Sequence, residues 1–366
     1  MQLPVNLQEL LKEAANIDAA RTTPLSLSIY VDPSAPSDLI AHVRSVFASD
    51  QPTVRMTLDY LDERPASAHP SDDMAIVVAG NSEVVGPAAL SVRSMGVPVM
   101  VCSTQPAQVD LIAAGVGAPI PDGDLISPQK AKRAPLAETI ASIKRMLGRE
   151  DTAAEVDQQS YARVAAIDIE TAMKDPIALD DDAKAVLDDR MGRWIVNVCR
   201  EKSLAFTLAF PFMRRSLAME AVSETSIQNA GVGFLPLIPG ADLPIMTANQ
   251  AKMALQIAAA YGEPMGKERA KEIVAIVGGA FVCRTVAREL IELVPVLGGV
   301  VRTGVGYFGT VAMGRAVIEY FEGGENVAGV TRVVERAADT ATDYASMAQG
   351  AFERVRNFIS NPVKSE

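Results

Sequence analysis

Two kinds of apolar pattern in the first third of the chain predict strands separated by amphipathic helices. Residues 25–31 (LSLSIYV) and 54–60 (VRMTLDY) alternate apolar and polar positions, as half-buried strands do. Residues 74–79 and 97–102 are continuous apolar runs, which are typical of central parallel strands covered on both faces. A helical pattern follows the first strand. Strands that alternate with helices predict a wound, mainly parallel α/β sheet.

The second half of the chain has a different pattern. From about residue 191 the apolar positions follow long helical stretches, and no strand-like alternation continues there. Residues 233–240 (GFLPLIPG) and 293–299 (LVPVLGG) match at a constant offset that also pairs Tyr261 with Tyr320. Each copy is predicted to be a helix end, a Pro/Gly turn, a second helix and a tyrosine near its end. The sequence therefore predicts an all-α domain with duplicated helical hairpins.

This helical region resembles a known family. The segments that carry the resemblance are LIPGAD, QAKM and AAYG in the first copy, and VPVLGG and MGRAVIEYF in the second. They are similar to the GTPase-associated helical family catalogued as domain of unknown function 697, over residues about 200–325. The resemblance implies a GTPase-like domain ahead of the helices and, in some members, membrane association. It implies no activity.

The α/β region resembles a translation-factor-class GTPase in the spacing of its elements, over residues about 25–148. The segment 72–104 has the order strand, loop, helix and strand, and Ile126-Ser-Pro-Gln lies where such a domain keeps its last base-contacting loop. The fold expected from this resemblance is a degenerate GTPase-like or Rossmann-like sheet.

The phosphate-binding chemistry of that class is missing from the sequence. A P-loop needs glycines, so that backbone N–H groups approach phosphate, and a Lys-Ser/Thr pair. The turn at residues 32–38 (DPSAPSD) has no glycine and no lysine, two prolines that cannot donate, and two carboxylates. Residues 102–106 (CSTQP) stand where a guanine-reading motif is expected. We therefore do not expect ordinary nucleotide hydrolysis or a bound cofactor.

Three residues at predicted strand ends are ligand candidates, because open α/β sheets bind ligands there. They are Asp32, Gly80 and Ser103. For Asp32, a role as a turn or capping residue is favoured over a role as phosphoacceptor or metal ligand. A receiver-type phosphoacceptor ends the third strand, whereas Asp32 ends the first. For Gly80, a connecting turn is favoured over an anion-binding loop.

Polar residues on the predicted helices give a second set of candidates. Asp242 follows the first Pro/Gly turn, and a cap for the next helix is its favoured role. Lys252 lies ten residues later, where a structural ion pair is favoured over an anion site. Arg284 interrupts an apolar stretch, which suits a buried polar network, a partner groove or lipid headgroups. Structural pairing with Glu289, Glu292 or Glu319 is the favoured role.

Composition narrows the classes of function. The net charge of −11 opposes nucleic-acid binding, which needs clustered basic residues. The chain has only two histidines, His42 on a predicted helix and His69 in a predicted loop, so we expect neither a His-based triad nor a multi-histidine metal site. The three cysteines, all in apolar surroundings, indicate free thiols in a reducing compartment. No uncharged run reaches the roughly 20 residues of a membrane-spanning helix, so we expect a cytoplasmic protein, with peripheral membrane association as an alternative.

The patterns divide the chain into five parts. They are an N-terminal amphipathic helix (1–22), the α/β domain (23–149), an acidic helical linker (150–190), the helical domain (191–325) and a C-terminal amphipathic helix (326–366). The leading hypothesis is a non-enzymatic adaptor, with a protein partner or self-association. Its alternative is a nucleotide-responsive or enzymatic protein with an unconventional site at the strand ends.

Overall fold

The structure is a computed structural model that describes residues 19–62, 69–129, 159–160, 164–165, 167, 176–234, 242–263 and 298–323. The chain separates into two compact units, which are described one at a time. One runs from Thr22 to Met213 and holds the sheet. The other combines residues 1–21 with 214–366 and is helical in its described part. An α/β unit followed by a helical unit confirms the predicted fold class.

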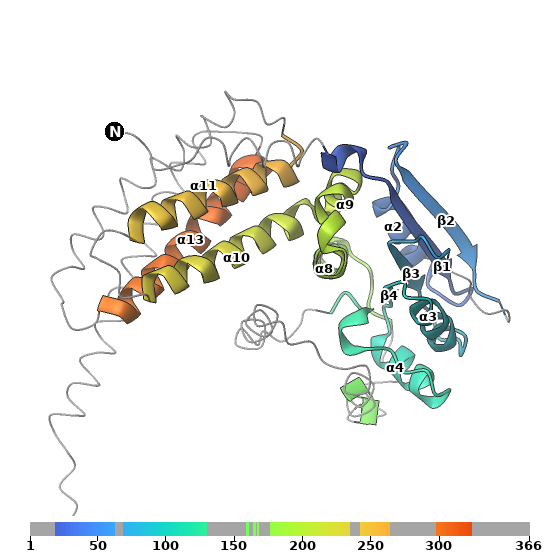
Figure 1. The fold of residues 1–366 in the computed structure, drawn as a ribbon. Helices are drawn as coiled ribbons and strands as arrows, with labels where there is room; N and C mark the ends of the chain where they lie inside the picture. The colour runs from blue at the N-terminus through green and yellow to red at the C-terminus, as the bar shows by residue number, and fades with distance from the viewer. Residues whose placement is uncertain are drawn as a thin grey trace, which may run out of the picture. The chain divides into compact units, whose positions relative to one another are not determined.

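The sheet of the first unit has five parallel strands (Figure 1). Its spatial order is β2-β1-β3-β4-β5. The strands are β1 (Leu25–Val31), β2 (Val54–Tyr60), β3 (Met74–Val78), β4 (Val99–Cys102) and β5 (Leu125–Ile126). All five residues of β3 are buried, whereas β2 at the edge is largely exposed. This is the flavodoxin-like doubly wound order, whose direction reverses between β1 and β3.

The reversal of direction distributes the helices over both faces of the sheet. Right-handed crossovers place α2 (Ser37–Val46) on the opposite face from α3 (Val85–Ser94) and α4 (Pro106–Gly115). One apolar cluster joins residues of β1, β3 and β4 to both α3 and α4. It includes Tyr30, Val77, Val101, Val85, Val92 and Val109. The core therefore lies between the sheet and its helices, and the loops lie at the ends of the strands.

Further helices belong to the unit with the sheet. They are α8 (Asp181–Val198), α9 (Ser203–Ala209) and the short turns η2 (Arg200–Lys202) and η3 (Pro211–Met213). Phe47, after α2, packs edge-on against Phe210 and Phe212 with ring centroids 5.2 Å apart in both pairs. The sequence placed the start of the helical domain at residue 191, whereas the structure divides the chain after Met213.

The acidic run before α8 begins the helix. Asp180 is the N-cap, and its carboxylate accepts a hydrogen bond of 2.8 Å from the backbone N–H of Ala183. Asp181 and Asp182 lie in the first turn, where negative charge is favourable toward the helix dipole. Leu187 and Met191 are fully buried on the inner side of the helix. Part of the predicted linker is thus an ordered helix of the sheet unit.

The helical unit is built on α10 (Arg214–Phe234), α11 (Asp242–Ala260) and α13 (Gly298–Glu322) (Figure 1). Small and aliphatic residues of all three helices form its core. Gly314 of α13 lies so close to Val222 of α10 that a Cβ there would stand 2.3 Å from Val222 Cγ2. None of the helices in the described part of the chain combines the length and apolar character needed to cross a membrane.

The predicted tyrosines lie at the ends of their helices. Tyr261 follows α11, where Gly262 takes a positive φ of 83° and closes the helix. The Tyr261 ring stacks on Phe321 with centroids 5.5 Å apart, and its hydroxyl donates to Glu322 at 2.9 Å. The first predicted Pro/Gly turn lies outside the described residues, so the duplication stays a prediction.

Candidate functional site

Asp32 and Gly80 meet at the carboxyl edge of the sheet. Asp32 directly follows β1, and its backbone N–H donates to the carbonyl of Val78, the last residue of β3, at 3.0 Å. Gly80 lies two residues beyond Val78. The strand order reverses between these two strands, and this is the point where doubly wound sheets bind ligands. The structure therefore places two predicted candidates where a ligand site would be.

The Asp32 carboxylate is fully buried and bound by donors from two loops. Its Oδ1 accepts from the N–H of Ser34 at 3.0 Å, and its Oδ2 accepts from the Ser34 hydroxyl at 2.9 Å. Across the switch point, Oδ2 also accepts from the N–H groups of Gly80 at 2.9 Å and Ser82 at 3.4 Å. Asp32 thus caps its own turn, as predicted, and also fixes the loop after β3.

The two loops are in close contact. The Ser34 hydroxyl accepts a hydrogen bond of 2.9 Å from the N–H of Asn81. A Cβ at Gly80 would stand 2.3 Å from both the carbonyl carbon and the Oγ of Ser34, so only glycine fits there. Backbone N–H groups at such a point normally face an anionic ligand. Here they face a side-chain carboxylate of the same chain.

Ser103 shares this edge of the sheet but has a separate set of partners. It is buried, its N–H donates to the carbonyl of Ile126 at 2.9 Å, and its Oγ accepts from the N–H of Gln105 at 3.0 Å. The Gln105 side chain in turn accepts 2.7 Å from the amide of Asn81. Ser103 therefore shapes the turn between β4 and α4. Its connection to the Asp32 loop runs through Gln105 and Asn81.

The helix α8 and the residues before it contact the loops around β4 and β5. Ile177 N–H donates to the carbonyl of Thr104 at 3.0 Å. Arg190 donates to the carbonyl and hydroxyl of Ser127 at 2.8 and 3.1 Å. One turn later, Trp194 Nε1 donates to Asp124 at 2.9 Å. Sequence reasoning missed these contacts, although a four-residue spacing on one helix face was a usable signal.

Burial shifts the titration of several groups beside β4 and β5. It lowers the pKa of Arg190, and Arg193 nearby lowers it further. Burial raises the pKa of Asp124 despite the hydrogen bond from Trp194 and the charge of Arg93. The Cys102 thiol at the end of β4 has its pKa raised to about 12 by burial. A thiol with so high a pKa is a poor nucleophile at neutral pH.

Two buried hydroxyls at the same edge lack a hydrogen-bond partner within the described residues. They are Ser82 Oγ, in the loop after β3, and Thr104 Oγ1, after β4. Thr104 is 2% exposed. Unpaired buried hydroxyls are uncommon in native proteins. Each of these two hydroxyls could form a hydrogen bond with a further polar group.

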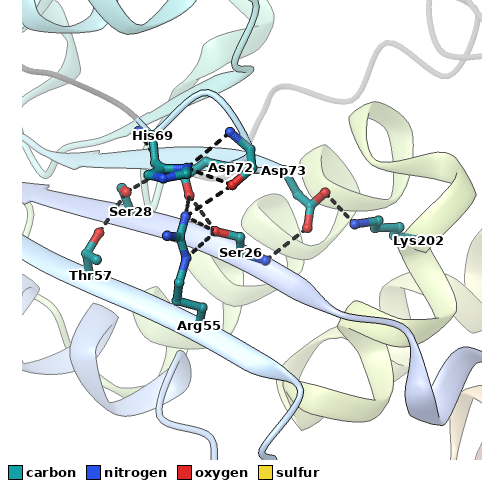
Figure 2. A network of polar contacts seen from close by, with 9 residues as sticks. Ser26, Ser28, Arg55, Thr57, His69, Asp72, Asp73 and Lys202 are labelled. Atoms are coloured by element: carbon teal, nitrogen blue, oxygen red, sulfur yellow. Dashed lines mark hydrogen bonds and ion pairs between the residues drawn. The ribbon is translucent and has the colours of Figure 1, made fainter.

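A second polar cluster lies at the opposite, amino end of the strands (Figure 2). The carboxylate of Asp72 accepts hydrogen bonds of 2.5 Å from the hydroxyls of Ser26 and Ser28 and of 2.9 Å from Arg55. Burial by itself raises the pKa of this carboxyl, but those bonds, together with the N–H of His69, outweigh it and leave the pKa lowered. Sequence reasoning missed this cluster, because its members are far apart in the chain.

The neighbouring Asp73 links the strands to η2. Its side chain accepts from the N–H of Ser26 at 3.0 Å and from Lys202 at 2.7 Å. Figure 2 shows Lys202 against Asp73, and Lys202 also donates to the carbonyl of Pro24 at 2.9 Å. Both aspartates are therefore satisfied by partners inside the unit. This arrangement is structural, because the Asp72 side chain is 1% exposed and both of its oxygens accept hydrogen bonds from this unit.

Two of the three candidates of the helical unit, Asp242 and Lys252, lie on α11. Asp242 is the first residue of α11. A cap at Asp242 would instead require the helix to begin at the next residue. Lys252 is exposed in the middle of α11. Arg284 lies outside the described residues.

A buried amide network is the main polar feature of the helical core. The Asn229 side chain is fully buried; it donates to Thr310 Oγ1 at 2.9 Å and accepts from Asn249 at 2.9 Å. Gln250 donates to the same Thr310 oxygen at 3.1 Å. These contacts join all three helices. A network of this kind fixes how helices align, because a shift would leave buried amides unpaired.

Metal binding and known relatives add no further assignment. In the parts of the chain that the structure describes, no three His, Cys, Asp or Glu side chains are grouped to hold a metal ion. Comparison of the chain with protein-family models, with curated proteins and with solved structures gives no significant match. The resemblances stated above therefore stay predictions.

Proposed function

We propose that this protein is a non-enzymatic adaptor whose α/β unit is a protein-binding platform and whose helical unit binds a helical partner or a membrane surface. The observation that carries the proposal is the position of Asp32. Its carboxylate accepts hydrogen bonds from the N–H groups of Ser34, Gly80 and Ser82 at the point where a doubly wound sheet would hold a phosphate.

A phosphate at this point would meet three obstacles. The backbone N–H groups that could bind it already donate to the Asp32 carboxylate. The negative charge of Asp32 would also repel it. The close contact between Gly80 and Ser34 also leaves no space for an anion between the loops. Displacing the N–H groups from Asp32 would leave a buried carboxylate without its donors, which is costly. These reasons support a role that does not depend on a nucleotide.

One observation favours a second candidate, a small-ligand site at the strand ends. Ser82 Oγ and Thr104 Oγ1 are buried without partners, and a polar ligand could satisfy both. Such a ligand would bind beside the Asp32 cradle. It would be neutral or cationic, because the Asp32 carboxylate accepts from the N–H of Ser82 and so places a negative charge beside the site.

A thermal-shift panel on the full chain separates the two candidates. The panel contains ATP, ADP, GTP and GDP with Mg²⁺, inorganic phosphate, and a set of neutral and cationic metabolites. A ligand present at 100 times its dissociation constant stabilises the folded state by about 2.7 kcal/mol. The adaptor proposal predicts no shift with any member. A saturable shift with a nucleotide contradicts it, and a shift with a neutral ligand supports the second candidate.

The adaptor proposal also needs a positive test. Flotation of the full chain with phosphatidylcholine vesicles, with and without about 30% anionic lipid, measures the membrane version. Retention of the full chain's partners from lysate, identified and then rebuilt from purified components, measures the protein version. If the chain neither floats nor forms a rebuilt complex, the adaptor proposal fails.

A further inference from the structure

The strand β2 is an edge strand with an unusual exposure. It is last in the sheet order, and the only described strand that it pairs with is β1 (Figure 1). Met56 is 40% exposed and Tyr60 is 60% exposed. Its seven residues contain no proline or lysine, the usual devices that protect an edge from pairing. An edge of this length is suited to accept another strand.

The apolar residues on one face of β2 extend the buried apolar row of β1 to the sheet edge, where they are partly exposed. In the parallel register, Leu27 lies beside Met56, Ile29 beside Leu58 and Val31 beside Tyr60. The three β1 residues are buried, whereas their β2 neighbours are exposed or half-buried. The other face of β2 carries Arg55, Thr57 and Asp59. The edge thus offers an apolar row on one face and a charged row on the other.

We propose that β2 pairs antiparallel with β2 of a second copy of this chain, about a two-fold axis at Thr57. The strand sequence VRMTLDY is self-complementary in this register. Arg55 meets the second copy's Asp59, Met56 meets its Leu58, and Val54 meets its Tyr60. Opposite-charge pairs and pairs of aromatic with β-branched residues both stabilise cross-strand neighbours.

The geometry of a symmetric pair limits the choice of register. A two-fold axis perpendicular to the sheet keeps the two faces of β2 on the same sides in both copies. One residue of β2 must therefore lie opposite its own copy, with the axis between the two. If it passed through Met56 or Leu58, Arg55 would lie opposite Thr57 or Leu61 and the charge pair would be lost. Thr57 is therefore the centre that makes every pair favourable.

Arg55 is held in place for this contact. Its Nε and Nη2 donate to Ser26 Oγ at 3.0 and 2.7 Å, and Nη2 also donates to Asp72 at 2.9 Å. The side chain is nonetheless 47% exposed. These bonds use Nε and Nη2, and they leave Nη1 as a donor for a further acceptor. A guanidinium fixed beforehand loses less entropy when it pairs with Asp59 of a second copy.

The interface expected from one strand on each side is small. Specific complexes usually bury about 1,200–2,000 Å² in total, and a seven-residue strand pair lies at or below that range. We therefore expect a weak dimer whose fraction rises with concentration. The inference goes beyond the adaptor proposal and does not depend on it, because it concerns the sheet edge alone.

Sedimentation velocity of the full chain tests the pairing between about 1 µM and about 1 mM, the range expected for a weak interface. Asp59→Arg places two arginines opposite each other at both ends of the pair and is expected to keep the chain monomeric. Asp50→Arg is the matched control, since Asp50 is also exposed and the charge change is equal. It is expected to dimerise like the wild type. A wild type that stays monomeric throughout, or equal dimerisation by both variants, overturns the proposal.

A cysteine scan tests the register independently of those charges. Residues paired across the axis have Cα atoms about 4.5–5.5 Å apart, within the range that a disulfide needs. Thr57→Cys should therefore form an intermolecular disulfide under mild oxidation. Asp59→Cys, whose partner would be Arg55, should not, and neither should the wild type. Equal cross-linking at both positions, or none at residue 57, contradicts the register and the proposal.

Discussion

The carboxylate of Asp32 accepts a hydrogen bond of 2.9 Å from the backbone N–H of Gly80, across the point where the strand order reverses. This bond brings an internal anion to the position that an α/β sheet usually offers to a ligand. The sheet keeps the donors of a phosphate cradle, and the chain itself supplies the acceptor. The account of the α/β unit as a non-catalytic platform rests on this relationship.

Gly80→Ala is expected to destabilise the sheet unit. The new Cβ would stand 2.3 Å from the backbone carbonyl carbon of Ser34, which cannot move without disturbing Asp32. Overpacking of this kind costs about 1–3 kcal/mol in the free energy of unfolding, measured by urea denaturation. Gly115→Ala at the end of α4 is the control, because nothing lies within 4 Å of its Cβ. Equal stability of the two variants would contradict the close loop contact.

Gly314→Ala tests the packing of the helical unit in the same way. Its Cβ would stand 2.3 Å from Val222 Cγ2, and the stiff β-branched valine cannot rotate freely away. We expect a loss of about 1–3 kcal/mol in the free energy of unfolding. Gly231→Ala in α10 meets no atom within 4 Å and should gain up to about 1 kcal/mol from helix propensity. A neutral Gly314→Ala would mean that α10 and α13 pack less closely than described.

Asn229→Ala should destabilise the helical unit through the amide network. The change removes the acceptor of the Asn249 amide and one of the two donors to Thr310 Oγ1, which keeps its bond from Gln250. Unsatisfied buried polar groups cost about 1–3 kcal/mol each in the free energy of unfolding. Gln228→Ala, the neighbouring exposed amide on α10, is expected to change stability by less than about 0.5 kcal/mol. Thermal denaturation of both variants measures the difference.

The stability that Asp72 provides should depend on pH. Its folded-state pKa is lowered, so its contribution is fully present above the unfolded value of about 3.9. The contribution is lost as pH falls from there through the folded-state pKa. The difference in free energy of unfolding between the wild type and Asp72→Asn should therefore be largest near neutral pH and shrink below about pH 4. A difference that is constant with pH would show that Asp72 is not held as a carboxylate.

Much of the sheet could be predicted, because its signals are local. The buried strands β3 and β4 are continuous apolar runs, and the half-exposed β2 alternates. The absence of a glycine-lysine phosphate loop was also visible in the turn after Asp32. Patterns of this kind can be read from neighbouring residues, because the burial of a strand determines which of its positions are apolar.

The site could be predicted only in part, because its decisive contacts are long-range. The turn role of Asp32 follows from Ser34, two residues away, but its bond to Gly80 joins residues 48 positions apart. The same is true of Ser26 with Asp72 and of Trp194 with Asp124. The boundary of the helical domain was placed too early because α8 is amphipathic, and periodicity does not say which unit a helix packs on.

The most direct test of the central claim is to remove the internal anion and offer another. Asp32→Gly leaves the N–H groups of Ser34, Gly80 and Ser82 unpaired, so it should lower the free energy of unfolding by about 2–4 kcal/mol. The measurement is thermal stability of the wild type and this variant against increasing formate, with chloride at equal ionic strength as the control. We predict that formate stabilises Asp32→Gly saturably and leaves the wild type unchanged relative to chloride. An equal response of the two proteins, or an Asp32→Gly variant as stable as the wild type, would contradict the claim that Asp32 occupies an anion site.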